Sequence, residues 1–200
     1  SPENVFTGGD FDAQQIYVTQ DGHTQLLLET EVVTAIAVDG ANRKWIGTQN
    51  AGVFLFSDDG QDQVYHFEAN TSPLLSNTIT SIAIDGKSGE VFFGTSQGLC
   101  SYRSTATEGL ENFEDVYAFP NPVRPGYSGM VAIKGLVKDC HVKITDISGT
   151  MVYQTKALGG QAIWDCRTLS GNKVSSGVYM VFLTNDDGSK TAVTKILVIN

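Results

Sequence analysis

The chain has 200 residues, of which 41% are hydrophobic and 10% aromatic, and its formal net charge is −9. This composition can supply a buried core and excludes global disorder, and the length allows one large domain or two small ones. No apolar run is long enough to span a membrane, and no signal peptide opens the sequence.

The charge is divided unevenly along the chain. Residues 1–115 contain 4 Lys and Arg against 17 Asp and Glu, a net of −13, whereas residues 116–200 contain 9 against 5, a net of +4. This asymmetry indicates two domains with different surfaces. The acidic first half argues against nucleic acid as a partner, because nucleic-acid binding needs a basic surface.

A repeat is visible in the first half. Ile36 and Ile82 are 46 residues apart and begin similar segments. A period of this length with three or four short strands is typical of a propeller blade. One copy comprises Thr34–Gly40, Lys44–Thr48, Gly52–Phe56 and a fourth candidate strand Gln63–Phe67, and the other comprises Thr80–Gly86, Glu90–Thr95 and Gly98–Tyr102.

Residues 14–30 predict part of a preceding blade, with strands at Gln15–Val18 and Gln25–Leu28. Two blades and a fragment cannot close a ring, because propellers have at least about four blades. The sequence is therefore expected to be truncated, with an open blade face and free strand edges through which the chain self-associates.

The repeated residues have mechanical roles. In each copy an Asp-Gly pair, Asp39-Gly40 or Asp85-Gly86, is expected to form a hairpin turn in which the Asp side chain caps backbone N–H groups. Gly47 and Gly94 are expected where a neighbour packs closely. The alternating apolar residues are expected to face a packed layer between adjacent blades; they are Ile36, Val38, Ile82 and Ile84.

The polar, acidic segment Ser104–Asp115 predicts a linker. We set the boundaries at residues 1–109 for the blades, 110–117 for the linker and 118–200 for a second domain. Pro120 and Pro122 fix an extended entry to that domain. About seven short strands in 85 residues favour an immunoglobulin-like sandwich. The strands expected are Met130–Lys134, His141–Asp146, Thr150–Thr155, Gln161–Asp165, Val178–Thr184 and Ala192–Ile199, with hairpin turns at Ser148-Gly149 and Asp187-Gly188.

The candidates for reactive chemistry do not form a known constellation. His23, His66 and His141 lie in separate contexts, outside any hydrolase motif. Asp58–Asp62 and Asn185–Gly188 hint at calcium, but plain hairpin turns are favoured because the oxygen-ligand spacing is incomplete. We therefore predict no catalytic, cofactor-binding or metal residues and no cofactor.

Three features leave two interpretations each. Cys140 and Cys166 could form a disulfide, although buried free thiols are favoured, and Cys100 stands apart. Trp45 and Trp164 could stack on sugars, although packing in the core is favoured. A group of lysines could gather on one face of the sandwich to meet phosphate-bearing lipopolysaccharide, or could be an ordinary solvated surface; they are Lys134, Lys138, Lys143, Lys190 and Lys195.

Both halves resemble known families. Trp45–Thr48 with Gly52-Val53 resembles the two-component-regulator propeller repeat, from which Phe92–Thr95 of the second copy departs. The last 85 residues resemble the type IX secretion C-terminal sorting domain and the flagellar-hook-capping immunoglobulin-like domain, with Cys166 where the family usually has Gly. The matching segments are Phe119–Val123, Ile144–Gly149, Trp164-Asp165, Ser176–Tyr179 and Lys195–Val198.

The junction resembles the PorZ-type family of surface proteins of Bacteroidota, through Gly89–Thr95, Ser101–Arg103 and Asp115–Pro125. This resemblance implies a non-enzymatic protein at the cell surface, associated with the outer membrane, or in the periplasm of a Gram-negative bacterium. It also implies the secretion machinery or an anionic lipopolysaccharide or glycan as partner, because family members help the surface sortase attach anionic lipopolysaccharide to cargo.

We therefore expect the C-terminal part of a surface binding and docking protein. Two alternatives stay open. The chain could belong to the ligand-sensing propeller of a two-component regulator, which a membrane span and kinase after the sandwich would support, although Lys195–Asn200 has the pattern of a chain end. It could instead carry the sorting domain of a secreted cargo enzyme, which is removed after export.

Overall fold

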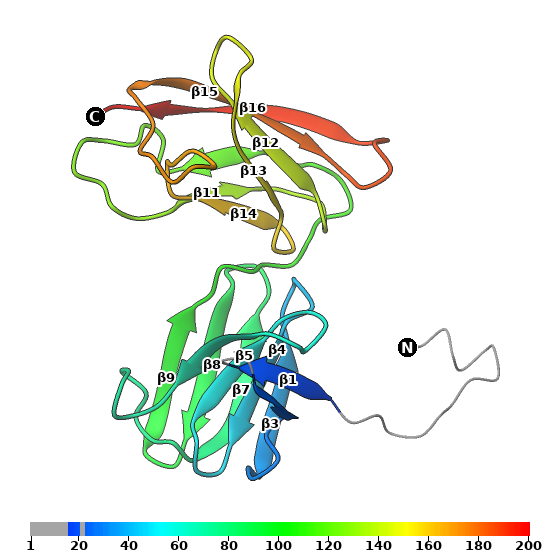
Figure 1. The fold of residues 1–200 in the computed structure, drawn as a ribbon, viewed down its shortest axis with the longest axis vertical. Coiled ribbons are helices and arrows are strands. Elements are labelled where there is room, and N and C mark those ends of the chain that lie inside the picture. The colour runs from blue at the N-terminus through cyan, green and yellow to red at the C-terminus, as the bar shows by residue number, and fades with distance from the viewer. Residues whose placement is uncertain (1–15, 21–22) are drawn as a thin grey trace, which may run out of the picture.

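The structure is a computed structural model that describes residues 16–20 and 23–200. These residues form β-strands and turns, which confirms the predicted all-β fold. Figure 1 shows two parts, a group of blade-like sheets from the first half of the chain and a sandwich from the second half. Within the described residues no helix could span a membrane.

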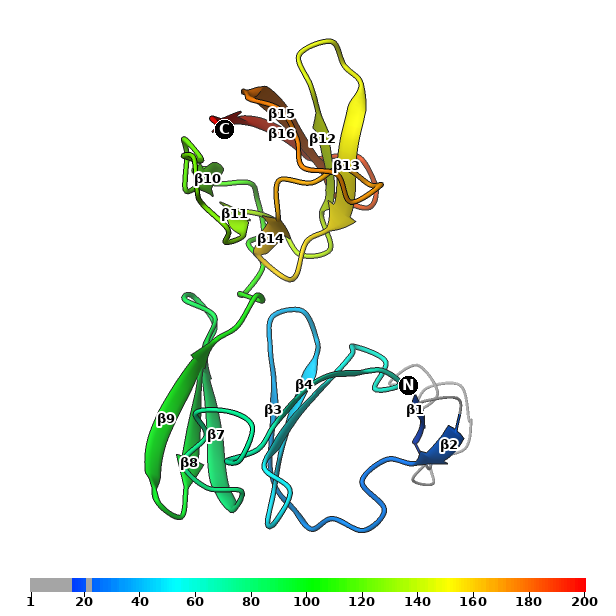
Figure 2. The same ribbon diagram turned by 60° about the vertical axis from the view of Figure 1, so that its left-hand side comes forward.

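The blade part contains a hairpin and two antiparallel sheets, in agreement with the predicted partial propeller. The first blade sheet has the order β3-β4-β5-β6 and the second has the order β7-β8-β9. In Figure 2 these two sheets stand face to face, with the hairpin on the far side of the first. The strands are β1 (Tyr17–Gln20), β2 (His23–Leu26), β3 (Val33–Val38), β4 (Lys44–Thr48), β5 (Val53–Phe56), β6 (Gln63–Phe67), β7 (Ile79–Asp85), β8 (Glu90–Thr95) and β9 (Gly98–Arg103).

The core of the blade part lies between the two blade sheets. Trp45 of β4 is fully buried there, and its ring centroid is 5.6 Å from that of Phe93 on β8. Val91 is also fully buried in this cluster. The close approach predicted at Gly47 is confirmed, because a Cβ at that position would come within 2.5 Å of the Ile79 side chain from the neighbouring sheet.

Alternating apolar residues were expected to face a packed layer between adjacent blades, which is right for Ile82 and Ile84 and wrong for Ile36 and Val38, since only the hairpin segment lies on that side of the first blade sheet. Ile82 and Ile84 pack against the Trp45 cluster. Ile36 and Val38 remain 64% and 54% exposed. Ile36 pairs with Ile46, so both lie on the face of the first blade sheet that points away from the second blade sheet.

The sandwich consists of a three-stranded sheet, β10-β11-β14, and a four-stranded sheet, β13-β12-β15-β16. Its core includes Trp164, whose ring meets that of Tyr179 edge-on at 5.4 Å between centroids. Pro120 and Pro122 follow the end of β10, a short strand that the sequence did not predict as such. The strands are β10 (Tyr117–Phe119), β11 (Val131–Lys134), β12 (His141–Thr145), β13 (Met151–Lys156), β14 (Gln161–Trp164), β15 (Gly177–Thr184) and β16 (Thr191–Val198).

A matched pair of substitutions tests where the blade core lies. Val91→Ala should lower the free energy of unfolding by about 2 kcal/mol, because it leaves a cavity beside Trp45. Val38→Ala should change it by less than about 0.5 kcal/mol, because that side chain is already half in solvent. Denaturant unfolding of the two variants measures the difference, and equal losses would contradict the assignment.

Candidate functional site

The blade part ends at the junction in a buried ion pair. Asp39 follows β3, and its Oδ2 lies 2.9 Å from Nη2 of Arg43. Its Oδ1 accepts hydrogen bonds from the backbone N–H groups of Ala41 and Arg43 at 3.0 and 3.1 Å, so the predicted capping by this Asp is confirmed. Both charged residues are buried. An isolated charge would be strongly unfavourable here, and the pair offsets that penalty by mutual contact and by the backbone hydrogen bonds.

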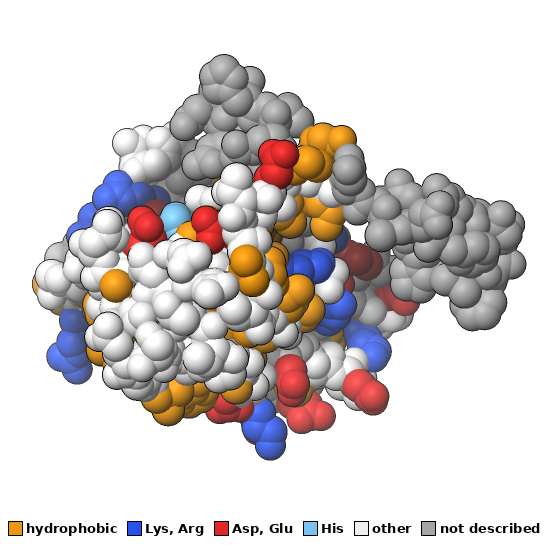
Figure 3. Space-filling model, turned by 90° about the horizontal axis from the view of Figure 1, so that it is seen from below, with side chains coloured by type: hydrophobic (Ala, Val, Ile, Leu, Met, Phe, Trp, Pro, Cys, Tyr) orange, Lys and Arg blue, Asp and Glu red, His pale blue; other side chains and the backbone are white. Residues whose placement is uncertain are grey.

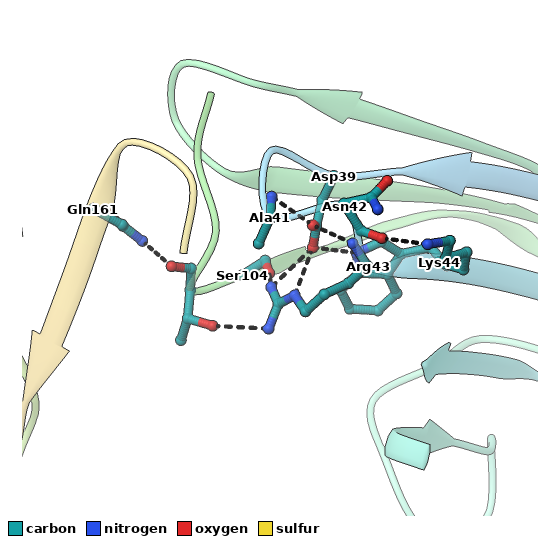
Figure 4. A network of polar contacts seen from close by, with 9 residues as sticks. Asp39, Ala41, Asn42, Arg43, Lys44, Ser104 and Gln161 are labelled. Atoms are coloured by element: carbon teal, nitrogen blue, oxygen red, sulfur yellow. Dashed lines mark hydrogen bonds and ion pairs between the residues drawn. The ribbon is translucent and has the colours of Figure 1, made fainter. Parts of the chain in front are cut away.

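The same arginine reaches the start of the predicted linker. Nη2 of Arg43 donates to Oγ of Ser104 at 2.9 Å, and Nη1 donates to Oγ1 of Thr105 at 3.3 Å. From the sandwich, Nε2 of Gln161 donates to the carbonyl oxygen of Thr105 at 2.6 Å. Figure 4 shows this line of contacts, which runs from the turn after β3, through residues 104 and 105, to β14 of the sandwich.

The next residues continue the contact through their backbones. The Thr107 N–H donates to the Leu158 carbonyl at 3.2 Å, and the Thr107 carbonyl accepts from the Gly160 N–H at 3.0 Å. Gly40 from the blades and Gly159 from the sandwich both lie against the Thr107 carbonyl, where a Cβ on either would overlap that oxygen. The sequence indicated a turn role for Gly40 but gave no sign of this approach.

These contacts hold the blade part and the sandwich in one relative orientation. The charged and polar side chains of the junction are held by one another. The arrangement is suited to presenting two surfaces in a constant orientation.

The proposed boundaries at residues 109, 110, 117 and 118 remain predictions, since residues 110 and 111 also contact the sandwich through Leu136 and Lys190.

The histidines are separated in the structure. The ring of His66 on β6 stacks on Phe54 with 3.9 Å between centroids, whereas His141 on β12 lies 3.0 Å from Asp186 at the exposed end of the sandwich. His23 lies on β2, and its side chain is outside the described part. No group of three or more His, Cys, Asp or Glu side chains is placed to hold a metal ion within residues 16–20 and 23–200.

The two acidic segments that hinted at calcium form hydrogen-bonded turns. Oδ1 of Asp59 accepts from the Ser57 hydroxyl at 2.6 Å, and this bond is the main reason that the pKa of Asp59 is lowered. Oδ1 of Asp187 accepts from the Ser189 N–H at 2.9 Å, and hydrogen bonds from Ser189 likewise lower the pKa of Asp187. These carboxylates therefore cap their own loops, as the turn interpretation predicted.

Both tryptophans belong to the cores. Trp45 is fully buried and Trp164 is 1% exposed. The indole N–H of Trp164 donates to the Arg167 carbonyl at 2.8 Å, which fixes the loop after β14. Neither ring can stack on a sugar, so the core interpretation is correct.

The five lysines do not share one face of the sandwich, so the alternative of a single lysine patch is wrong. Lys143 and Lys195 are exposed on the outer face of the four-stranded sheet, while Lys134 points outward from the opposite sheet. Lys138 lies beside Gly109, and Nζ of Lys190 donates to the Glu111 carbonyl at 2.5 Å. The sequence could not reveal this, because the face of each lysine depends on which sheet its strand joins.

The three cysteines are free thiols. Burial raises the pKa of the Cys140 thiol to about 11, and burial likewise raises the pKa of Cys166. Cys166 has a backbone φ of 58°, in the left-handed region that favours glycine. Cys166 therefore adopts a backbone conformation that glycine adopts readily.

Exposed apolar side chains and a small cavity mark the blade part. Seen from its free end, apolar side chains form separate groups with acidic side chains beside them (Figure 3). Ile36 and Val38 lie on the outward face of the first blade sheet, and Leu99 of β9 is 67% exposed. A cavity of about 130 Å³ opens between the sheets, lined mainly by aromatic and apolar residues; they are Phe67, Ser72, Pro73, Leu74, Phe93, Cys100, Ser101 and Tyr102.

Comparison with known proteins gives one family and one informative structure. Residues 117–200 match the family described as the secretion system C-terminal sorting domain. None of the curated proteins matches the chain. Among solved structures, the chain is 33% identical to PorZ of Porphyromonas gingivalis, described as an essential bacterial surface component of the type IX secretion system, with a TM-score of 0.66.

The match to PorZ covers 99% of this chain and 27% of PorZ, so the chain spans about a quarter of the length of that protein. The extracellular domain of a hybrid two-component system from B. thetaiotaomicron is 13% identical, with a TM-score of 0.32 and coverage of 90% of this chain and 27% of that one. A second such domain from the same organism is 13% identical, also with a TM-score of 0.32, and the match covers 88% and 28%.

The fold and these matches define an all-β protein whose residues 117–200 match the model of the secretion system C-terminal sorting domain. The particular protein that the chain resembles along almost its whole length is PorZ, which confirms the resemblance seen at the junction residues. The expected location at the cell surface or in the periplasm of Bacteroidota is confirmed by the same two matches.

Breaking the junction ion pair should destabilise the protein. Arg43→Ala leaves Asp39 buried without its partner, and we expect the free energy of unfolding to fall by about 3–5 kcal/mol. Arg103→Ala is the matched control, because its pair with Glu90 is largely exposed and should cost at most about 1 kcal/mol. Chemical denaturation measures both. Limited proteolysis should show faster cleavage of residues 104–116 in Arg43→Ala only, and unchanged cleavage there would contradict the role of the junction.

Thiol labelling tests burial and thiol pKa together. Because the thiolate is the reactive form, a raised pKa slows alkylation near pH 8. Cys100, which is half-buried, should react first, whereas Cys140 should react only as the pH approaches about 11 or the protein unfolds. Mass spectrometry after alkylation with iodoacetamide gives the order, and early labelling of Cys140 in the folded protein would contradict it.

Proposed function

We propose that the chain is the C-terminal part of a non-enzymatic docking component of the type IX secretion machinery. The observation that carries this proposal is the 33% identity to PorZ over 99% of the chain, which includes both the blades and the sandwich. A secretion component and a sorting domain are binding modules, and the described residues supply two cores and a junction whose charged groups are already paired.

The proposed mechanism is presentation of two surfaces at a fixed angle. The blades carry the acidic half of the sequence, and the sandwich carries the basic half. The contacts of Arg43, Thr107 and Gln161 hold the two parts together, so a partner that contacts both meets a preformed shape. A preformed surface loses less conformational entropy on binding than a surface made of two domains that move independently. The outward apolar faces of the blades are then covered by the remainder of a longer polypeptide or by a second copy.

We further propose that the sandwich handles anionic lipopolysaccharide or a related surface glycan. Its net charge of +4 supports this proposal, since opposite charge favours encounter with an anionic surface. The blades, with a net charge of −13 in residues 1–115, would be repelled by the same surface. The sandwich would therefore face the glycan and the blades would face a protein partner.

The sorting-domain match also supports an alternative function, in which the chain is the C-terminal part of a secreted cargo protein. The two functions differ in the fate of residues 117–200. A machinery component keeps its sandwich, because the sandwich is the part that docks, whereas cargo loses it after export. The sensor alternative is supported only by the resemblance of Trp45–Thr48 with Gly52-Val53 to the two-component-regulator propeller repeat.

Peptide mass spectrometry of washed cells of the source bacterium distinguishes the first two functions. We expect peptides from both halves of the chain at equal abundance in the mature surface protein, and deletion of the gene should leave cargo with sorting domains unattached to the surface. Blade peptides without sandwich peptides would overturn the docking proposal in favour of the cargo function.

Sedimentation with vesicles tests the glycan proposal. The purified chain should sediment with vesicles that contain lipopolysaccharide from the source bacterium and stay in solution with vesicles of neutral lipid alone. Raising the salt concentration to about 0.5 M should weaken the binding, because it screens charge attraction. Absence of sedimentation at low salt would overturn this part of the proposal.

A further inference from the structure

A cavity of about 400 Å³ lies at one end of the sandwich. This volume falls within the range of small-molecule sites, roughly 300–1,000 Å³. It lies between the loop after β10, the loop after β14 and the end of the chain after β16, which Figure 1 shows at the same end of the sandwich. The residues around it are Val123, Arg124, Tyr127, Ser128, Gly129, Met130, Asp165, Cys166, Arg167, Lys173, Val198 and Asn200.

Cationic side chains outnumber carboxylate side chains in the lining of the cavity. Its lining includes three cations, Arg124, Arg167 and Lys173, and one carboxylate side chain, Asp165. The Asp165 carboxylate lies 3.7 Å from Nε of Arg167. Neither Arg124 nor Lys173 forms an ion pair with a carboxylate in the described part of the chain.

Two of these cations face each other across a β-bridge. Arg167 and Lys173 are antiparallel bridge partners. Like charges directly opposite each other destabilise a pair of strands. Asp165 lies beside Arg167 only, so an anion close to both cations would further reduce their repulsion. The uncharged residues between them, Thr168, Ser170 and Asn172, form turn hydrogen bonds with one another.

The walls are fixed without a ligand. Nη1 of Arg167 donates to the Gly171 carbonyl at 2.7 Å, and the Arg167 carbonyl accepts from the buried Trp164 indole. On the other side, Val123 pairs with the last strand through two backbone hydrogen bonds of 2.8 and 2.9 Å. The Tyr127 hydroxyl donates to the Met130 carbonyl at 2.9 Å, which holds an aromatic ring beside the cations. A preformed site of this kind loses little entropy on binding.

We propose that this cavity binds an anionic sugar residue, one that carries a phosphate or carboxylate group. Arginine and lysine bind such groups by charge-assisted hydrogen bonds, and the apolar faces of Tyr127 and Met130 suit the C–H face of a sugar ring. This inference rests on the proposed glycan function. It places the glycan-binding site in this cavity and not at the lysines on the outer face of the four-stranded sheet.

Titration of the full chain with glucose 6-phosphate tests the cavity directly, with NMR chemical shifts as the readout. We expect saturable binding that is at least about tenfold tighter than that of inorganic phosphate, and no saturation with glucose. Arg124→Ala and Lys173→Ala should each weaken the Kd about tenfold, the loss expected for a hydrogen bond to a charged group. Both side chains are exposed, so the variants should keep the unfolding midpoint of the parent.

Lys143→Ala and Lys195→Ala are the matched controls, because these lysines are equally exposed but lie on the outer sheet face. They should leave the Kd unchanged. Equal weakening by the control substitutions, unchanged binding in Arg124→Ala and Lys173→Ala, or equal affinity for inorganic phosphate would overturn the proposal.

Lipopolysaccharide vesicles separate this proposal from the function on which it rests. If the parent chain sediments with them and the Arg124→Ala, Lys173→Ala double variant sediments equally, the cavity proposal is overturned and the glycan function stands. If the parent fails to sediment yet binds glucose 6-phosphate through these two residues, the cavity proposal is supported and the lipopolysaccharide function is overturned.

Discussion

The arrangement of this protein depends on the buried pair of Asp39 and Arg43. The carboxylate holds the turn after β3 and the guanidinium, and the guanidinium in turn holds Ser104 and Thr105. Gln161 then attaches Thr105 to the sandwich. The attraction between two buried charges offsets their desolvation cost only when their remaining hydrogen bonds are also satisfied. The hydrogen bonds that Arg43 donates meet this condition, and they hold the junction in one geometry.

The two blade sheets differ in their number of strands, and the difference lies where the second one leads into the junction. Within the described residues the first blade sheet has four strands and the second has three. After β5 the chain turns back to form β6, whereas after β9 it continues to Ser104 and the sandwich. The segment that would have been a fourth strand is therefore used to connect the two parts. The small aromatic cavity beside Tyr102 lies along β9, next to the edge that this diversion leaves uncovered.

Much of the fold could be predicted from local patterns. The Asp-Gly turns, the close approach at Gly47 and six of the sandwich strands follow from residue type and period. The exposure of Ile36 and Val38 agrees with the predicted open blade face. They lie on the face of their sheet that corresponds to the Ile82 face of the next sheet, and only the hairpin segment packs on that side. The distribution of the five lysines could not be predicted either, because the face of each lysine depends on which sheet its strand joins.

The candidate sites were harder to predict than the fold, because they join residues that are distant in sequence. Arg43 and Ser104 are separated by 61 positions, and Thr105 and Gln161 by 56. The cavity with Arg124, Arg167 and Lys173 combines two loops that no motif links. One signal was present: Trp164-Asp165 followed by Cys166 in place of Gly marked an unusual loop, and that loop forms one wall of the cavity.

The position of Thr107 has a consequence for engineering and for evolution. Its carbonyl lies between Gly40 and Gly159, which come from opposite halves of the chain. A hybrid that grafts this sandwich onto the blades of a relative would need glycine at both places, and a side chain at either would force the halves apart. Exchange of these domains between proteins is therefore limited to pairs whose loops are compatible, even though each half has a core of its own.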